Sequence, residues 1–436
     1  MKVRVATSSQ INAAVAGLDA WLETMRCPGG YGGPVAHWWQ QSLMYTGAGL
    51  DWRYEGIIIG YLQLWERTGD AIWLEKACRA GDDLVAGQLE DCHFGASAFE
   101  LNPATAGTPH EAACDTGLLR LAKALRKTAG QDWEKYALCA EHNLQSFYIE
   151  ELWDAGTQSF RDSPTVPSFV PNKAATACEA LLLLAEITGG ASWIELYVLP
   201  TLDRILEHQV CGEGRLDGAI AQNSFGSRKV EKYFPIYIAR CIPSLLQGFQ
   251  VTNQEKYAEG ALRAMQFISR WGYEDGSFPT VVYQNQRVNR YPSWIAALGD
   301  ILRTADVLRP YGFDTDLTAT ENRLLAGQDD SAAMQTATGF AAQVDGQVEP
   351  IPDLRDVLHV AGWCDKAFRY LTSKAGPGLP AAQSSRFETT CKLQGQILQL
   401  EETPEILEVR RDRNVVYYWC KGEPWPQVAS PEFWLH

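Results

Sequence analysis

The sequence lacks the excess of basic residues that a nucleic-acid-binding protein needs. Its 436 residues include 38 Lys and Arg against 53 Asp and Glu, which gives a formal net charge of −15 at pH 7. A protein that binds DNA or RNA neutralises phosphates with a basic face. The composition therefore excludes general nucleic-acid binding, and we expect no nucleic-acid partner.

Long apolar runs are also missing. A helix that spans a bilayer needs about 18 or more predominantly apolar residues, and no stretch of the chain approaches that length. The first residues, MKVRVATSSQINAAVAGLDAW, contain no continuous apolar segment followed by a small-residue cleavage site. We therefore expect no membrane partner and a cytoplasmic location.

Metal and cofactor motifs are absent as well. The 11 cysteines are odd in number and form no CxxC pair. Several of them, Cys114, Cys139, Cys178 and Cys241, stand beside Ala and Leu in helical patterns, where free Cys behaves as a small buried hydrophobe. The chain has no HExxH, no Walker sequence and no GxGxxG after a strand. We expect reduced cysteines, no metal site and no cofactor.

What the sequence does contain is a repeat. Trp73, Trp133 and Trp193 are spaced 60 residues apart, and Tyr257 stands at the equivalent point of a fourth copy. Each copy has amphipathic helical spacing on both sides of a Gly or Asn turn, which suits a left-handed helix cap followed at once by a new helix. The repeat predicts an array of helical hairpins.

The first helix of each hairpin is the more apolar one, so we expect it to lie inside, with the charged second helix outside. The inner helices are predicted to begin near Asp51, Pro109, Pro171, Val230, Pro292 and Pro352. The outer helices are predicted near 9–26, 71–89, 132–150, 192–209, 255–271 and 315–327. Six inner and six outer helices can close into a ring. The predicted fold class is an all-α (α/α)6 toroid.

The chain changes character near its C-terminal end. AGPGLPAAQSS reads as a linker, and EILEVRRDRNVVYYWC has β-branched and aromatic runs around a turn. We expect a toroid domain over 1–375 and, over 376–436, a linker with a short β-rich tail packed on the toroid.

The two ends of the predicted ring differ. Turns inside the hairpins are short, whereas the connections 27–39, 94–109, 155–171, 212–228 and 273–292 are long and rich in Gly, Pro and aromatic residues. Long loops are uncommon in compact domains unless they are functional. We expect the ligand site at this end, at an open mouth.

The TGD..WLEKA turn, the 60-residue period and the DGSF loop element resemble those of six-hairpin (α/α)6 toroid enzymes, over about residues 9–374. The resemblance is to unsaturated glucuronyl hydrolases and N-acylglucosamine 2-epimerases, and it implies a toroid that acts on saccharides. It transfers no catalytic role to any residue, because no catalytic motif is matched. Lanthionine-synthetase cyclases and terpenoid cyclases are similar in toroid, but their Cys-His zinc pair and DxDD motif are absent here.

Basic residues gather at the predicted starts of the inner helices, although the protein is acidic. Helix N-termini already favour anions, so this clustering predicts an anion-binding mouth. Alternatively, each cation pairs with a neighbouring acid such as Glu55, Glu231 or Asp356. The polar candidates for substrate binding are Arg53, Asn172, Lys173, Arg228, Lys229, Lys232, Arg290 and Arg355.

Candidates for proton transfer lie at the same end. They are Asp51, Glu55, His110, Glu111 and Asp275. Asp51 is alternatively a helix cap, and Thr108-x-x-Glu111 matches a capping box. The aromatic candidates, which stack on sugar rings or fill the core, are Trp38, Trp39, Tyr233, Tyr291 and Trp294.

These features predict an enzyme that uses general acid-base catalysis on an acidic saccharide, as a hydrolase, lyase or epimerase, with a small-molecule or oligosaccharide substrate. Two alternatives stay open. One is an isoprenoid-type cyclase or transferase whose basic cluster binds pyrophosphate. The other is a non-catalytic toroid that binds glycans.

Overall fold

The computed structural model describes residues 5–35, 44–46, 48–97, 107, 110–128, 132–212, 214–329, 331–340, 361–379, 387–393, 396–403, 405–420, 423 and 427–429. Among the candidates named above, Trp38, Trp39, Thr108 and Arg355 lie outside these residues, as do Pro109 and Pro352, where two inner helices were expected to begin.

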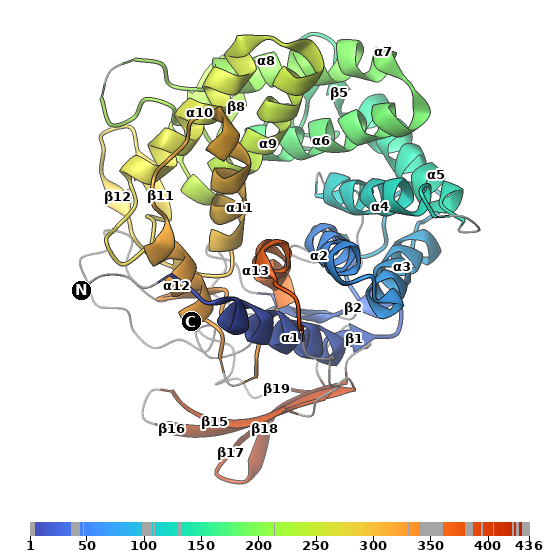
Figure 1. Ribbon diagram of the computed structural model, residues 1–436, viewed down its shortest axis with the longest axis vertical. Coiled ribbons are helices and arrows are strands. Elements are labelled where there is room, and N and C mark those ends of the chain that lie inside the picture. The colour runs from blue at the N-terminus through green and yellow to red at the C-terminus, as the bar shows by residue number, and fades with distance from the viewer. Residues whose placement is uncertain are drawn as a thin grey trace.

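Six helices form an inner ring (Figure 1). They are α2 (Arg53–Thr68), α4 (Glu111–Leu125), α6 (Pro171–Thr188), α9 (Pro235–Thr252), α11 (Leu298–Leu308) and α13 (Ala361–Lys374). Each packs against the next in this order, and α13 packs against α2, so the ring is closed.

The outer helices alternate with the inner ones along the chain. They are α1 (Ser8–Thr24), α3 (Ala71–Ala86), α5 (Glu134–Asn143) continued by η1 (Leu144–Leu152), α7 (Ala191–Trp193) continued by η2 (Ile194–Val198) and α8 (Leu199–Glu207), α10 (Glu255–Arg270) and α12 (Thr318–Ala326). A turn of 3-10 helix, η3 (Arg309–Tyr311), follows α11. The first helix, α1, packs on the last, α13. The predicted alternation of inner and outer helices is confirmed.

The short turns of the hairpins use the expected backbone geometry. Gly69 and Gly189 end α2 and α6 with φ of 72° and 76°, and Asn253 ends α9 with φ of 55°. A residue in this left-handed conformation stops a helix and lets the next one start immediately. After Gly69, the side chain of Asp70 accepts a hydrogen bond from the Ile72 backbone N–H at the start of α3.

Two inner helices begin later than predicted. Helix α9 begins at Pro235 and not near Val230. The residues before it form the strands β9 (Arg228–Val230) and β10 (Lys232–Tyr233). Helix α11 begins at Leu298 and not at Pro292, because β13 (Ser293–Trp294) pairs with β14 (Ala337–Thr338). Pairing with distant strands takes precedence over the local helix-start signal.

The long connections therefore carry small β ribbons. Their other strands are β1 (Arg26–Cys27), β2 (Gly30–Tyr31), β3 (Gly33–Val35), β4 (Met44–Thr46), β5 (Trp153–Asp154), β6 (Ser159–Phe160), β7 (Ser168–Phe169), β8 (Asn223–Phe225), β11 (Val281–Tyr283) and β12 (Val288–Asn289). All the pairs are antiparallel.

The predicted β tail is confirmed, and it is a five-stranded antiparallel sheet, drawn below α1 in the view of Figure 1. Its strands, in order, are β15 (Phe387–Leu393), β16 (Gln396–Glu402), β17 (Ile406–Arg411), β18 (Asn414–Cys420) and β19 (Val428–Ala429). The turn between β17 and β18 places Asp412 and Arg413 at φ of 50° and 70°, which is the backbone that tight hairpins prefer.

The ten cysteines that the structure describes are all unbridged, and Cys114, Cys139, Cys178, Cys241 and Cys364 are buried. Across the described part of the chain, we find no helix with the length and apolar character to cross a bilayer.

Candidate active site

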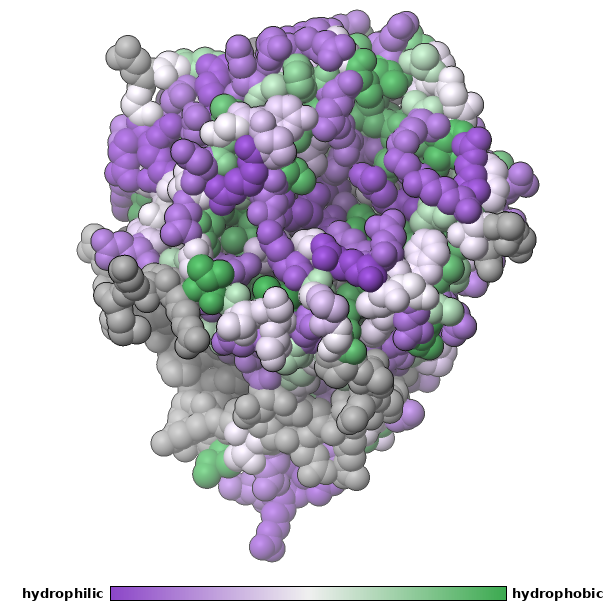
Figure 2. Space-filling model, in the orientation of Figure 1, coloured by the Kyte–Doolittle hydropathy of each residue, from purple (hydrophilic) through white to green (hydrophobic). Residues whose placement is uncertain are grey.

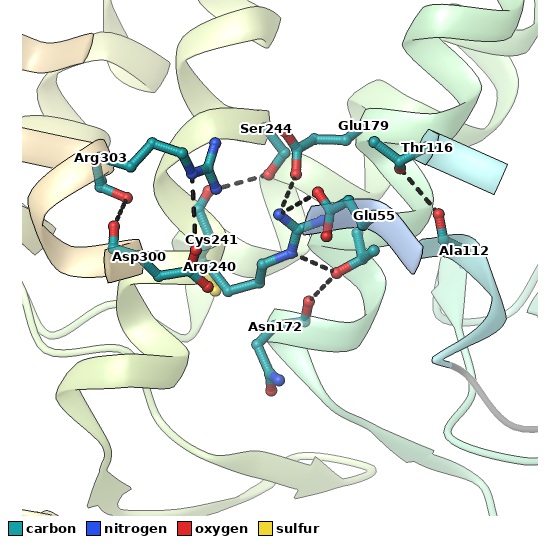
Figure 3. Close-up of polar contacts among 12 residues, drawn as sticks. Glu55, Ala112, Thr116, Asn172, Glu179, Arg240, Cys241, Ser244, Asp300 and Arg303 are labelled. Atoms are coloured by element: carbon teal, nitrogen blue, oxygen red, sulfur yellow. Dashed lines mark hydrogen bonds and ion pairs between the residues drawn. The ribbon is translucent and has the colours of Figure 1, made fainter. Parts of the chain in front are cut away.

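Single charges in apolar inner helices build the centre of the candidate site. Arg240 is the one charged residue of α9, and Glu179 stands in the middle of α6 between runs of Ala and Leu. A buried charge is costly unless it is paired. The two side chains pair with each other at 2.8 Å, and the same Arg240 nitrogen lies 3.0 Å from Glu55 of α2. Figure 3 shows Arg240 between the two carboxylates.

A second guanidinium extends this arrangement across the ring. Arg369 of α13 lies 2.6 Å from Glu55 and 2.6 Å from Asp300 of α11, and Arg303 lies 3.7 Å from Asp300. Acids and bases thus alternate, and five of the six inner helices contribute. We call this set the axial cluster: Glu179, Arg240, Glu55, Arg369, Asp300 and Arg303.

Two carboxylates of the axial cluster are held permanently ionised. Burial by itself would raise the pKa of Glu55, but the charges of Arg240 and Arg369 outweigh it and lower the pKa to about 2. Burial is likewise outweighed at Asp300, where Arg369 and Lys366 hold the pKa below its usual range. Neither group exchanges a proton near neutral pH.

Asp365 of α13 behaves in the opposite way. Burial raises its pKa to about 6, and Lys366 and Arg369 offset only part of that effect. One carboxylate oxygen, Oδ2, lies 3.3 Å from Lys366 Nζ, and the other, Oδ1, has no hydrogen-bond partner among the described residues. A Cβ on Gly56 would come within 2.6 Å of Oδ2. The carboxyl therefore lies against α2, one residue from Glu55.

Aromatic rings cover the N-terminal ends of four inner helices. Trp52 lies 5.0 Å from His110 and 6.2 Å from Trp363, and Trp363 lies 5.1 Å from Trp294, between ring centroids. We call these four residues the aromatic cap. The indole N–H groups of Trp294 and Trp363 are buried and donate to no acceptor in the described part of the chain. Lys366 Nζ lies 5.1 Å from the Trp363 ring.

The predicted proton-transfer residues are dispersed. Glu55 is in the axial cluster and His110 is in the aromatic cap. Asp51 is fully buried: its carboxylate accepts a hydrogen bond from the Arg53 backbone N–H at 2.9 Å and pairs with the Arg53 side chain at 2.9 Å. Arg53 also donates to the carbonyls of Gly32 and Gly49. This pair ties the first long connection to α2.

The carboxylate of Glu111 likewise holds a loop in place through hydrogen bonds. Its carboxylate accepts hydrogen bonds from Gly107 N at 2.7 Å, Ser97 Oγ at 2.5 Å and Asn143 Nδ2 at 2.6 Å, and it lies 3.2 Å from His93 Nδ1. The hydrogen bond to Glu111 raises the pKa of His93. These contacts join the connection after α3 to α4 and α5.

Asp275 lies in the turn after α10, on the outer rim. It accepts hydrogen bonds from the backbone and hydroxyl of Ser277 and lies 3.4 Å from Arg323 and 3.6 Å from Arg290. Although partial burial opposes them, these partners lower the pKa of Asp275.

The predicted cations do not share one cavity, which corrects the expected single anion site. Arg53 is buried with Asp51, Lys173 pairs with Asp162 at 2.7 Å, and Arg290 pairs with Asp275 and covers the Tyr273 ring. Each has a local acidic partner, as the alternative interpretation proposed. The remaining cations, Arg228, Lys229 and Lys232, line an open groove of about 870 Å³ beside β11 and β12.

The other predicted binding residues have these positions. Tyr233 is buried, 6.1 Å from the Phe267 ring, and Trp294 belongs to the aromatic cap. The carbonyl of Asn172 accepts a hydrogen bond from Thr176, whose hydroxyl in turn accepts one from Arg240 (Figure 3). Tyr291 is half-buried and follows the strand Val288–Asn289.

The described residues contain no group of three His, Cys, Asp or Glu side chains that could hold a metal ion. Among the described groups, Asp365 is a carboxyl with a raised pKa that interacts with the fixed charges of the axial cluster, and Lys366 lies near both Asp365 and the Trp363 ring.

No protein-family description matches the chain, and no curated protein is similar to it in sequence. Solved structures are similar in fold. The cellobiose 2-epimerase of Bacillus thermoamylovorans B4167 has a TM-score of 0.61 at 13% identity, over 84% of this chain and 99% of that one. The unsaturated glucuronyl hydrolase of Bacillus sp. GL1 has a TM-score of 0.59 at 15% identity, over 84% and 96%.

A third similar structure is the α-1,6-mannanase of Salegentibacter sp. HEL1_6, with a TM-score of 0.55 at 12% identity, over 85% of this chain and 99% of that one. All three are (α/α)6 toroid enzymes. These likenesses establish the fold that the resemblance implied.

Proposed function

We propose that the protein is a carbohydrate-active enzyme that binds an acidic saccharide at the loop-bearing end of the toroid and transfers a proton through Asp365. The observation that carries this proposal is that two carboxyls that interact electrostatically have opposite pKa shifts, Asp365 to about 6 and Glu55 to about 2. Environments that separate the pKa values of two neighbouring acids are the usual basis for assigning an acid and a fixed anion.

Each residue of the proposed site has a chemical task. A proton donor or acceptor works best when its pKa is near the operating pH, which Asp365 satisfies. Glu55, always ionised, supplies the negative charge that stabilises a cationic, oxocarbenium-like transition state. The indole faces of the aromatic cap stack on a sugar ring, and the free N–H groups of Trp294 and Trp363 supply donors to its oxygens.

The preference for an acidic saccharide rests on Lys366. Its ammonium group lies between Asp365 and the Trp363 ring, so a carboxylate on a stacked sugar would meet a cation there. When Asp365 is protonated, Lys366 loses its anionic neighbour and becomes available to the substrate. The polar axial cluster is unsuited to a hydrocarbon chain, which favours the saccharide over the isoprenoid alternative.

The experiment is an activity screen with three saccharides, namely an unsaturated uronyl disaccharide, an α-1,6-mannooligosaccharide and cellobiose. Reducing-end release, loss of the ultraviolet absorbance of the uronyl double bond, and formation of a 2-epimer separate the reaction types. We expect turnover of the uronyl substrate, abolished by Asp365→Asn and retained by Asp203→Asn, a matched change on the outer helix α8.

Turnover that survives Asp365→Asn would refute the assignment of Asp365. Saturable binding of all three saccharides without any turnover would instead identify a glycan-binding toroid.

A further inference from the structure

A second cavity opens at the other end of the ring. It has a volume of about 680 Å³ and is lined by residues of α2, α4, α6, α11 and α13, from the axial cluster to the last turn of α13. We call it the turn-side cavity, because the short hairpin turns lie at this end. Figure 2 shows the centre of the molecule hollowed, with largely hydrophilic residues around the hollow.

The turn-side cavity has an excess of positive charge. Six of its lining residues are basic and four are acidic: Arg120, Lys123, Lys127, Arg303, Arg369, Lys374, Glu55, Glu66, Glu179 and Asp306. Some of the cations have acidic partners, since Lys374 lies 2.6 Å from Asp306 and Lys123 lies 2.6 Å from Glu186. Basic residues in the last turn of a helix also offset its dipole, so the lysines need no ligand.

Arg120 and Arg303 are not explained in this way. Each lies more than one turn before the end of its helix. Arg120 makes no ion pair or hydrogen bond within the described part of the chain. The Nε and Nη2 groups of Arg303 are buried without a hydrogen-bond partner, and its side chain is 18% exposed. Burial and the neighbouring Arg369 lower the pKa of Arg303 to about 10, as expected where positive charge is incompletely compensated.

We infer that the turn-side cavity binds a small molecule that carries a phosphate, sulfate or carboxylate group, held by Arg120 and Arg303. Guanidinium groups present paired N–H donors that match the oxygens of these anions. The cavity is larger than a single phosphate, and Ile59, Leu62 and Val307 supply an apolar side for the body of the ligand. The inference rests on the charges of this cavity. The cavity shares Glu55 with the proposed active site, but Arg120 and Arg303 have no task in the proposed proton transfer.

The test uses inorganic phosphate, glucuronate and glucose as probes, titrated into the full-length protein by isothermal calorimetry at low ionic strength. We expect saturable binding of at least one anion, and none of glucose. Arg120→Gln should weaken binding about tenfold or more, because a charge-assisted contact is lost. The matched control is Arg287→Gln, an exposed cation on the other groove, which should bind as the natural protein does.

Lys127→Gln provides a second variant. Lys127 is exposed at the rim of the cavity, so the substitution should leave the fold intact. It should weaken anion binding by a smaller factor than Arg120→Gln does. Phosphate and glucuronate together distinguish a phosphorylated ligand from a sugar acid. Absence of saturable anion binding, or equal weakening by Arg120→Gln and Arg287→Gln, would overturn the inference.

A third outcome would also overturn it. If Arg120→Gln lowered kcat/KM for a saccharide, the turn-side cavity would be the substrate pocket and not a separate site. Because binding is measured without turnover, the binding result can be interpreted even if the protein shows none of the proposed enzyme activity.

Discussion

Replacing Asp365 with Asn should make the protein more stable while removing its activity. The substitution keeps the shape of the side chain and removes a group whose ionisation is opposed by burial. The carboxyl is 1% exposed, and its pKa is raised from 3.8 to about 6. Each unit of pKa shift corresponds to about 1.4 kcal/mol. The two-unit shift therefore costs roughly 3 kcal/mol of folding free energy at pH 8, as an upper estimate.

The sign of the pH dependence follows from proton binding. Between pH 4 and 6 the folded protein keeps the proton on Asp365 and the unfolded chain has lost it, so the stability falls as the pH rises through this range. The Asn variant lacks this loss. It should match the natural protein at pH 4 and exceed it at pH 8, by up to about 3 kcal/mol.

Glu55 titrates in a separate window. Its pKa is lowered to about 2, so its stabilising contribution is complete above pH 4.5 and is lost only as the pH falls toward 2. The assay is urea unfolding at pH 4, 6 and 8, followed by circular dichroism. Equal stability differences at all three pH values would refute the account, because they would place the effect in packing and not in ionisation.

Asp115 provides the matched control. It is another buried aspartate of an inner helix, neither carboxylate oxygen has a hydrogen-bond partner in the described structure, and burial together with Glu111 raises its pKa well above the usual value. It lies outside both the aromatic cap and the turn-side cavity. Asp115→Asn should therefore also be more stable at neutral pH, but it should retain full turnover. Loss of activity in both variants would show that the assay reports a general property of buried aspartates.

Other substitutions test the packing and the cluster. Gly56→Ala should destabilise the protein by about 1–3 kcal/mol in urea unfolding, because its Cβ would lie 2.4 Å from the Asp365 carbonyl oxygen; an unchanged midpoint would show that α2 and α13 separate easily. Glu55→Gln should cost about 3–5 kcal/mol, since it leaves Arg240 and Arg369 without a shared anion, and a loss under 1 kcal/mol would contradict the coupled cluster. Trp363→Leu should raise KM for the saccharide more than it lowers kcat if the ring stacks on the substrate, and a pure fall in kcat would argue against stacking.

The helical architecture could be predicted from the sequence because each hairpin repeats the same local signals. Trp73, Trp133 and Trp193 share a spacing, and Gly69 and Gly189 supply left-handed caps that depend on the turn itself. Such signals are contained within a few residues. The starts of α9 and α11 were misplaced because they depend on strand partners, such as the pairing of Trp294 with Ala337, which no local pattern reveals.

Of the axial cluster, the sequence predicted Glu55 as a site residue, and the other five residues were missed for a different reason. Attention to helix N-termini and to the long connections selected Asp51, Glu111 and Asp275, which cap turns or hold loops. The informative signal was a lone charge within an apolar inner helix, as with Arg240 in PIYIARCIPSLL and Glu179 in ACEALLLL. A charge in such a helix must find a partner inside the ring. Which helices supply the partners depends on ring closure, and Arg369 meets Glu55 only because α13 packs on α2.

Ion pairing distinguishes the groups that hold the toroid together from those that remain for ligands. Arg240 and Arg369 each contact two carboxylates, so the middle of the ring is balanced without any bound molecule. Buried donors without a hydrogen-bond partner among the described residues include the indole groups of Trp294 and Trp363 and the guanidinium of Arg303, as well as nitrogens of Arg240 and Arg369. Since native proteins leave few buried polar groups unpaired, the two ends of the axis are where ligands would complete the structure. The axial cluster lies between them, and four of its residues, Glu55, Glu179, Arg303 and Arg369, also line the turn-side cavity.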